Sequence, residues 1–432
     1  MTKGDGVFVE DDRGNRYLEA VSALWCVSLG FSNERLAKAG SDALHGLPYY
    51  HTFNGRSNPA VIALASKLLS IAPVPMSKVF FANSGSEAND TAVKLIWYYH
   101  NAIGKPQKKK IIARQNAYHG VTVAAASLCG LVTNHRDFDL PINNILHTDC
   151  PHYFRYAEPG EREEDFATRL AESLEKLILE EGPETVAAFF AEPVMGAGGV
   201  IVPPATYFEK VQKVLAKYDV LFVADEVVCG YGRTGEMFGS TTFGMKPDIL
   251  TTAKGLSSGY APISAVMVSE KVYTPIAANS GTIGTFGHGF TYSGHPVSCA
   301  VALETLKIYE EDNIVGHVQD LMPQFQKALR SYEGRKYVGE VRGVGLVGAI
   351  ELYADPKTRT GFDPAAKTGA RLVEIGLTQG LIVRALGDTI VFCPPLIITA
   401  AELDELFARF ERTMAIFEEK LSPDKLAVAP TS

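Results

Sequence analysis

Continuous apolar runs alternate with helical patterns from about residue 78 to residue 295, and this alternation constrains the fold more than any other feature. Several of the runs are apolar at every position, which is typical of strands covered on both faces of a sheet. Strands that alternate with helices predict a mostly parallel α/β sheet. The strand candidates are residues 78–82, 110–114, 186–191, 220–224, 248–251 and 263–268.

Shorter elements are predicted on either side of this region. They are two strands within 7–21, a helix at 57–72, a long helix at 296–311, a strand at 345–352, a helix at 364–379, a hairpin around Gly387 and Asp388, and a last helix that begins at Thr399. Thr399 and Glu402 match a capping box. We therefore expect a large domain of residues 56–315 and a small domain made of residues 1–55 and 316–432.

Charge and cysteine usage narrow the cellular setting. The formal net charge is −8 and there is no long basic run, which argues against nucleic acid and anionic membranes as partners. No apolar run approaches the ~20 residues of a membrane helix, and the N-terminus lacks a signal-peptide core. The six cysteines form no C-x-x-C pair, which favours free thiols in a reducing compartment. We expect a cytoplasmic protein.

A small-residue turn between a strand and a helix predicts an anion site. The sequence Asn83-Ser84-Gly85-Ser86 follows the strand at 78–82 and opens a helix. Free backbone N–H groups and the helix dipole favour negative charge there. Gly85 allows a phosphate to approach the backbone, and Ser86 can donate a hydrogen bond. The same residues also make a good helix N-cap, so this pattern alone leaves both interpretations open.

Two charged side chains follow neighbouring strands of the predicted sheet. Asp225 comes directly after the run 220–224, and Lys254 follows the run 248–251. Ligands of α/β enzymes bind at this carboxyl edge of the sheet. Partial burial lowers the proton affinity of a lysine, and a neutral amine can attack a carbonyl group. An isolated acid or lysine in such a place is more often solvated, so the hypothesis depends on their combination.

The combination matches the requirements of pyridoxal phosphate (PLP). This cofactor needs a lysine for its aldehyde, an anion beside its protonated pyridine nitrogen and a cradle for its phosphate. Lys254, Asp225 and the turn at 83–87 provide one of each. The sequence therefore predicts a PLP enzyme.

At these residues the chain resembles the class III (subgroup II) PLP-dependent aminotransferases, and among them the ω-transaminases that pass amino groups from amines or ω-amino acids to pyruvate. The resemblance implies PLP fold type I, with a seven-stranded, mostly parallel sheet and a small α+β domain. It also implies ping-pong transamination by a homodimer or a dimer of dimers with shared active sites. The matching motifs are NSGSEAND (83–90), AYHG (117–120), AEPVMGAGG (191–199), ADEVVCGYGRTG (224–235), AKG (253–255) and FTYSGHP (290–296).

The resemblance also assigns roles to individual residues. Lys254 is implied to be the Schiff-base lysine and proton shuttle, and Asp225 the partner of the pyridine nitrogen. Tyr118 and Val227 are implied to flank the ring, and Thr291 to reach the phosphate of the neighbouring subunit. The further residues implied to lie at the cofactor are Gly85, Ser86, His119 and Glu192.

The substrate pocket is implied by a second group of residues, namely Trp25, Phe53, Tyr118 and Arg384. Arg384 ends an apolar strand, and its guanidinium could grip the carboxylate of the amino acceptor, although a surface arginine fits the pattern too. Ornithine and GABA aminotransferases place an arginine immediately before F-x-P-P, where this chain has Val391, so these two activities are disfavoured. Asn54 takes a position that is often aromatic, which leaves the pocket size open.

Members of the family usually carry a further stretch before the segment that matches residues 4–6. We therefore expect either a more open pocket or a sequence that is a piece of a longer chain.

Three other functions are compatible with parts of these patterns. A PLP aminomutase, racemase or decarboxylase would keep the cofactor and change the reaction. A binding protein could keep the fold and lose the cofactor. A phosphate-binding NTPase is disfavoured because the chain lacks the G-x-x-x-x-G-K-[ST] loop. No metal site is predicted.

Overall fold

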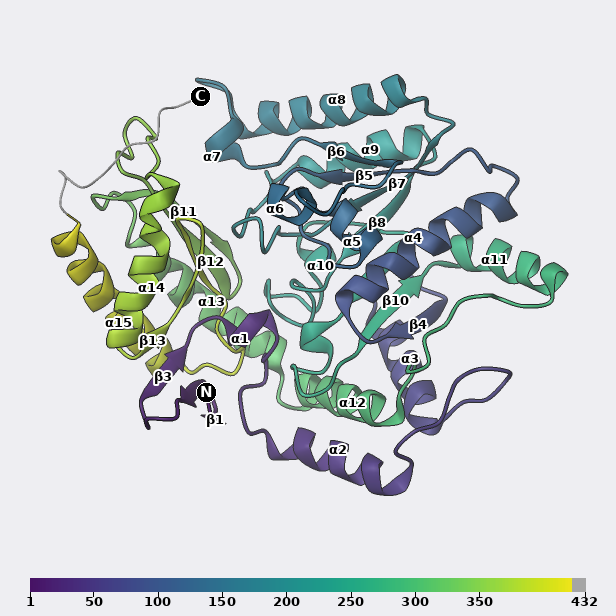
Figure 1. Ribbon diagram of the computed structural model, residues 1–432, viewed down its shortest axis with the longest axis horizontal. Coiled ribbons are helices and arrows are strands. Elements are labelled where there is room, and N and C mark those ends of the chain that lie inside the picture. The colour runs from purple at the N-terminus through teal and green to yellow at the C-terminus, as the bar shows by residue number, and fades with distance from the viewer. Residues whose placement is uncertain (422–432) are drawn as a thin grey trace.

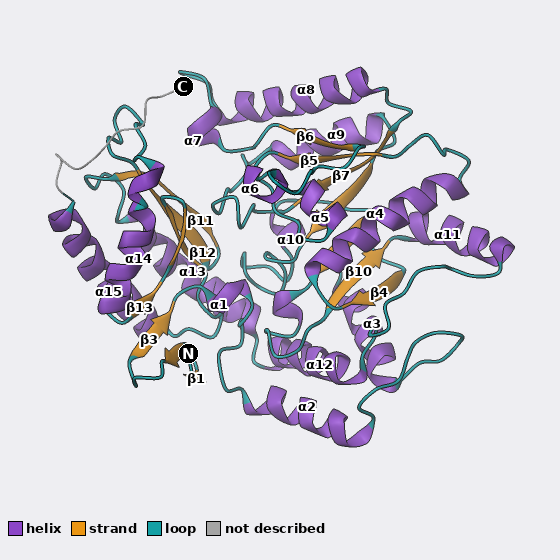
Figure 2. Ribbon diagram, in the orientation of Figure 1, coloured by secondary structure: helices purple, strands orange, loops and turns teal. Residues whose placement is uncertain are grey.

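The computed structural model describes residues 1–421 and arranges them around a seven-stranded sheet (Figures 1 and 2). The strand β10 is antiparallel to its neighbours β4 and β9, and all other pairs are parallel. The predicted α/β sheet is therefore confirmed. The order is β4 (Lys78–Ala82), β10 (Ser264–Val268), β9 (Ile249–Thr252), β8 (Leu221–Asp225), β7 (Val186–Ala191), β5 (Lys110–Arg114), β6 (Ile145–Thr148). The sequence pattern did not predict β6, because His147 interrupts its short apolar run.

Helices cover both faces of this sheet, as the apolar runs require. One face packs against α4 (Gly85–Ala102), α5 (Val123–Leu128) and α11 (Glu270–Ile283). The opposite face packs against α8 (Glu163–Glu181) and α9 (Tyr207–Lys217) at one end, and α3 (Pro59–Ile71) and α12 (Pro296–Glu311) at the other. Every residue of β7 is buried as a result. Shorter elements are α6 (Val132–His135), α7 (Tyr153–Tyr156), α10 (Gly239–Thr242) and the 3₁₀ turn η1 (Lys254–Leu256).

Two four-stranded sheets form a smaller unit. The first has the order β1 (Lys3–Asp5), β2 (Phe8–Glu10), β3 (Arg16–Glu19), β13 (Leu381–Ile382), and the second β11 (Val338–Val344), β12 (Val347–Leu352), β15 (Thr389–Phe392), β14 (Arg384–Leu386). The parallel pair β3–β13 joins the beginning of the chain to a late segment. The helices α13 (Ile314–Arg330), α14 (Thr368–Thr378) and α15 (Ala400–Lys420) lie in this unit, and the capping box predicted for α15 is present (Figure 1).

The structure differs from the predicted elements at several boundaries. The predicted helix at 364–379 begins later, because a 3₁₀ turn (Pro364–Ala366) and the left-handed Lys367 precede α14. Two helices follow β3, α1 (Ser22–Trp25) and α2 (Glu34–Gly46), and α2 packs against α12. The division into residues 56–315 and 1–55 with 316–432 stays a prediction. Within residues 1–421, no helix combines the length and the apolar character that a membrane crossing needs.

Candidate active site

Eight of the predicted site residues line one cavity of about 130 Å³ at the carboxyl edge of the large sheet. This edge is where parallel strands end together, so side chains that are distant in sequence meet there. The eight residues are Gly85 and Ser86 at the start of α4, Tyr118 and His119 after β5, Glu192 after β7, Asp225 at the end of β8, Val227, and Lys254 after β9. Gly120, Val228 and Ala253 complete the lining.

The start of α4 has the shape of an anion cradle. Ser84 is the N-cap and accepts a hydrogen bond from the Glu87 N–H at 3.2 Å. The capping bond is thus made by Ser84, while Ser86, two residues later, lines the cavity. The Ser86 hydroxyl oxygen accepts from the Val121 N–H at 3.0 Å. A Cβ added to Gly120 would lie 2.4 Å from that oxygen, so only glycine fits between the two loops.

The carboxylate of Asp225 is buried and held by three donors. His119 Nδ1 and Asn89 Nδ2 each lie 2.8 Å from Asp225 Oδ2, and the Val227 N–H donates to Oδ1 at 3.0 Å. Asn89 was not predicted as a site residue. The sequence feature that could have indicated Asn89 is its position four residues after Gly85, because residues four apart lie on the same face of a helix.

Lys254 lies at the first position of η1, directly beyond β9, with a φ of +44°. Its side chain is half-buried. Burial raises the pKa of the Cys26 thiol, and the positive charge of Lys254 opposes this rise.

Glu192 fixes the backbone that presents Tyr118. Its carboxylate accepts from the Tyr118 N–H and from the Gly196 N–H, both at 3.0 Å. Burial raises the pKa of Glu192, and the nearby His119 opposes this rise. Burial also raises the pKa of Tyr118, whereas the positive charge of Arg384 lowers it. Arg384 is exposed at the start of β14.

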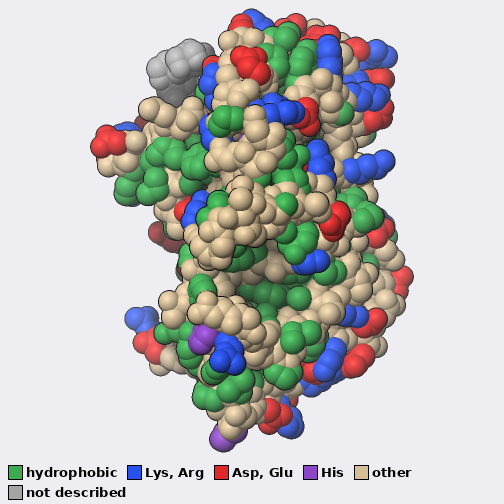
Figure 3. Space-filling model, turned by 90° about the vertical axis from the view of Figure 1, so that its right-hand side faces the viewer, with side chains coloured by type: hydrophobic (Ala, Val, Ile, Leu, Met, Phe, Trp, Pro, Cys, Tyr) green, Lys and Arg blue, Asp and Glu red, His purple; other side chains and the backbone are tan. Residues whose placement is uncertain are grey.

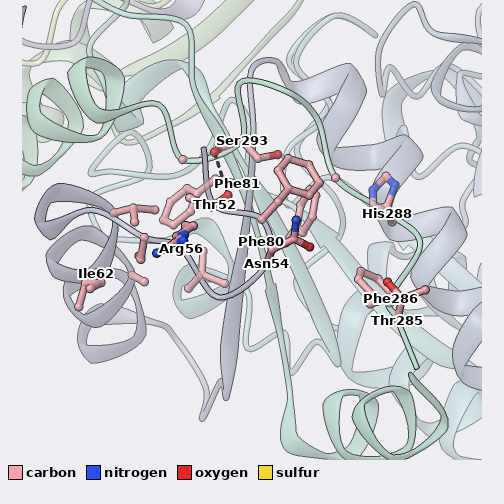
Figure 4. Close-up of a pocket in the computed structure, with 17 residues that line it drawn as sticks. Thr52, Asn54, Arg56, Ile62, Phe80, Phe81, Thr285, Phe286, His288 and Ser293 are labelled. Atoms are coloured by element: carbon pink, nitrogen blue, oxygen red, sulfur yellow. Dashed lines mark hydrogen bonds between the residues drawn. The ribbon is translucent and has the colours of Figure 1, made fainter. Parts of the chain in front are cut away.

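Four predicted residues do not line this cavity. Arg384 is one of them, and Trp25 is another, because its side chain is buried in an apolar cluster that also contains Val228. Thr291 is exposed in the loop before α12, where its carbonyl accepts from Tyr49 at 2.8 Å. Phe53 lines a separate pocket of about 610 Å³ (Figure 4).

The larger pocket around Phe53 carries different chemistry. Figure 4 shows Phe80, Phe81 and Phe286 in its lining, with His288 at one side. It contains neither the amine nor the carboxylate that the cofactor chemistry requires, although it is larger than the cavity at Lys254. The smaller cavity is therefore the candidate active site.

Comparisons with known proteins agree with this geometry. Residues 1–414 match the family model described as Aminotransferase class-III. A chloroplastic gamma aminobutyrate transaminase 3 of Solanum lycopersicum is 52% identical over 422 residues, which cover 98% of this chain and 81% of that protein.

Solved structures of transaminases match nearly the whole chain as well. One described as a transaminase with L-ala has a TM-score of 0.96 at 57% identity, covering 97% of this chain and 99% of the other. The ω-transaminase of Pseudomonas jessenii in complex with PMP has a TM-score of 0.96 at 52% identity, covering 98% and 93%.

Proposed function

This chain belongs to the class-III aminotransferases, and we propose that it passes amino groups from amines or ω-amino acids to a keto acid such as pyruvate. The cofactor of the family is PLP. The observation that carries the proposal is the single cavity lined by Lys254, Asp225 and the start of α4.

The residues of the cavity fit PLP. Gly120 and Ser86 approach each other so closely that a Cβ at Gly120 would fill the space between them. The N-terminus of α4, at Gly85, points toward the same place. The buried Asp225 carboxylate offers the negative charge that a protonated pyridine nitrogen needs. When bound, PLP supplies an electron-withdrawing ring that stabilises negative charge on the substrate carbon.

Within this proposal the side chains have distinct tasks. Lys254 Nζ would hold the cofactor through its aldehyde, and as a free amine it would carry a proton to and from the substrate carbon. Tyr118 and Val227 flank the ring, with the aromatic face of Tyr118 suited to stacking. Val228 and Ala253 exclude water from the remaining walls.

Substitution of Lys254 tests the proposed chemistry. Lys254→Ala should abolish keto-product formation from an amine plus pyruvate and should remove the visible absorbance of the bound cofactor. Lys271→Ala, which only loses an exposed ion pair with Asp248, is the matched control and should keep both. Turnover of Lys254→Ala at near wild-type rate would overturn the assignment, and product formed without any keto acid would indicate a racemase or decarboxylase.

We assign the binding of the keto acid's carboxylate to Arg384. Its positive charge opposes the rise that burial causes in the pKa of Tyr118, and a guanidinium can bind a carboxylate with two parallel hydrogen bonds. Arg384→Ala should raise the KM for pyruvate about tenfold, since one charge-assisted contact is lost. The rate with an amine donor that carries no carboxylate should stay the same. An equal loss with both substrates would contradict a role in carboxylate binding.

The donor is identified by a panel of amines with pyruvate as acceptor. Val391 before the F-x-P-P motif disfavours GABA, yet the similar plant proteins are named gamma-aminobutyrate transaminases. The panel therefore contains GABA beside β-alanine, taurine, putrescine and 1-phenylethylamine. Our proposal predicts that at least one of these amines yields its carbonyl product together with L-alanine, and activity with none of them would contradict it.

We further propose that two copies of the chain form a dimer with shared active sites. Large apolar side chains are exposed around the loop between α2 and α3 and the loop before α12, namely Tyr49, Tyr50, Phe53, Ile62 and Tyr292. Figure 3 views the side of the molecule that carries these loops and shows hydrophobic side chains around a hollow. Apolar patches of this kind mark interfaces. A second copy would bring Phe53 and Thr291 to the neighbouring cavity.

Hybrid dimers test the shared site. Lys254→Ala removes the lysine of a subunit, and Thr291→Glu places a negative charge where the partner's phosphate is expected. Each variant alone should be inactive, but a mixture that exchanges subunits should regain activity, because each hybrid contains one intact site. Mixtures that stay inactive although hybrids form would contradict sharing, and a monomer in sedimentation would contradict the dimer itself.

For the cellular location we propose the cytoplasm. The support is that all six cysteines are free, which suits a reducing compartment. The similar plant proteins are named chloroplastic or mitochondrial, and cell fractionation decides between these compartments.

A further inference from the structure

Asn89 is buried between the two ends of the candidate cofactor site. It lies on α4, four residues after Gly85, and its side chain is fully inaccessible to solvent. Its amide nitrogen donates to Asp225 Oδ2 at 2.8 Å and to the backbone oxygen of His119 at 2.7 Å. Its amide oxygen accepts from the Thr251 hydroxyl at 2.9 Å. Both N–H donors of the amide are thus used, and its oxygen accepts one hydrogen bond.

The orientation of the Asn89 amide follows from these partners. A carboxylate and a backbone carbonyl can only accept hydrogen bonds, so the atom between them must be the NH₂ group. The hydroxyl of Thr251 then holds the amide oxygen from the other side. The side chain has one possible orientation, which the surrounding α4, β8 and β9 fix.

This arrangement also determines which oxygen of Asp225 can serve a ligand. A carboxylate has about four acceptor positions, two on each oxygen. Both positions of Oδ2 are filled by His119 Nδ1 and Asn89 Nδ2, and one position of Oδ1 is filled by the Val227 N–H. The single free position therefore lies on Oδ1, and a rotation of the carboxylate would break the two bonds to Oδ2.

We infer that Asn89 is a positioning residue that holds Asp225 with one acceptor position turned toward the ring nitrogen of the cofactor. Because Asn89 and the anion cradle belong to the same turns of α4, the helix sets the phosphate end and the pyridine end of the site together. The inference rests on the proposed function, in which Asp225 pairs with the ring nitrogen.

A cofactor analogue separates positioning from a merely structural role. In 1-deazapyridoxal 5′-phosphate a carbon replaces the ring nitrogen, so the analogue cannot use Asp225. Dissociation constants of PLP and of this analogue are measured on the dimeric apoenzyme by fluorescence titration. Asn89→Leu, of similar shape but without donors, should weaken PLP binding about tenfold and change analogue binding less than about twofold.

A control and a second variant complete the design. Asn101→Leu makes the same change at the exposed end of α4, where the Asn101 side chain accepts a hydrogen bond from Lys109, and should leave both constants unchanged. Thr251→Val removes the hydroxyl that orients the amide and should reproduce the PLP-specific loss at smaller size. This variant decides the question if Asn89→Leu does not fold.

The outcomes are distinguishable from a failure of the proposed function. Equal weakening of PLP and of the analogue by the Asn89 and Thr251 variants, or no weakening, would overturn the inference. Asp225→Asn tests the underlying assignment, since it should weaken PLP alone. If Asp225→Asn fails to discriminate between the two cofactors, the proposed role of Asp225 is wrong. If it discriminates and the Asn89 and Thr251 variants do not, only the positioning role is wrong.

Discussion

At the scale of single residues, the cradle depends on glycine where two loops meet. Gly120 has a φ of +137°, and an added Cβ would lie 2.4 Å from Ser86 Oγ and 2.8 Å from Ser86 Cα. A side chain there would displace the residue that opens α4 and so change the geometry of the anion site. The family resemblance at the motif AYHG (117–120) implied cofactor contacts nearby, but this close approach became apparent only in the structure.

Gly120→Ala should therefore weaken cofactor binding. The methyl group must push Ser86 away, and a shift of this residue misaligns the phosphate contacts, so the dissociation constant for PLP should rise at least about tenfold. Gly46→Ala, where an added Cβ meets nothing within 4 Å, is the control and should bind PLP normally. Titration of the two apoenzymes with PLP measures the difference, and unchanged binding by Gly120→Ala would contradict the close fit.

At the scale of elements, the short segment α1 after β3, which contains Trp25, has an energetically unfavourable backbone conformation. Ser22, Ala23 and Trp25 all have positive φ values of 50°, 58° and 65°. The buried carboxylate of Glu19 accepts from the Val21 N–H at 3.2 Å and from the Ala23 N–H at 2.5 Å. Such conformations cost free energy and persist only where other contacts hold them. Glu19 supplies these contacts.

Glu19 should also make the stability of the protein depend on pH. Burial raises its pKa from 4.5 to about 7, against the two backbone hydrogen bonds that lower it. A raised pKa in the folded state means that the contribution to stability is complete below pH 4.5 and is lost as the pH rises through about 7. The shift corresponds to about 3 kcal/mol, taking roughly 1.4 kcal/mol for each pKa unit.

Glu19→Gln removes this titration and tests the sign. The free energy of unfolding of the wild type, relative to that of the variant, should fall by up to about 3 kcal/mol between pH 4.5 and pH 8. Denaturant titrations at both pH values measure it. In a Trp97→Phe background Trp25 is the remaining tryptophan, and its emission reports whether the turn has moved. A pH-independent difference would contradict the raised pKa.

At the scale of the whole molecule, an ion-pair network around the buried Glu351 joins the smaller unit to the large one. Arg155, in α7, lies 2.5 Å from a carboxylate oxygen of Glu351 on β12. Arg342 on β11 lies 2.6 Å from the other oxygen of Glu351 and donates to the Gly199 carbonyl at 2.7 Å. His152 contacts Glu340 at 2.7 Å. These contacts fix the position of the smaller unit relative to the large one.

Glu351→Gln should destabilise the protein in a pH-dependent manner. Burial alone would raise the pKa of Glu351, but Arg342 and Arg155 outweigh it and lower the pKa to about 2. A lowered pKa stabilises the fold above the unfolded value of 4.5, and this contribution is lost as the pH falls toward 2. At pH 7 the variant should lose about 3 kcal/mol, and the loss should shrink below pH 4.5.

Unfolding in denaturant at pH 7 and at pH 3.5 (roughly one unit below the unfolded pKa) measures this loss. Glu405→Gln breaks an exposed pair with Arg409 and is the control, expected within about 0.5 kcal/mol of the wild type. A loss for Glu351→Gln that is as small as the control would contradict the role of the network.

The sequence by itself determined the large sheet, apart from its edge strand β6, and the main groups at the carboxyl edge. Apolar runs on both sides of helical patterns specify parallel strands, and residues that follow such strands meet at one edge whatever the connections between them. Lys254, Asp225 and the turn at Gly85 were therefore predictable, and they line one cavity.

Only the tertiary structure decided which distant side chains touch. The bonds from Asn89 to Asp225 and from Thr251 to Asn89 depend on the order of β8 and β9 and on where α4 lies across them. Local patterns do not encode this order, because periodicity reports which face a residue occupies and not which neighbour it meets. For the same reason the position of Phe53, in a pocket separate from the cavity at Lys254, emerged only from the folded molecule.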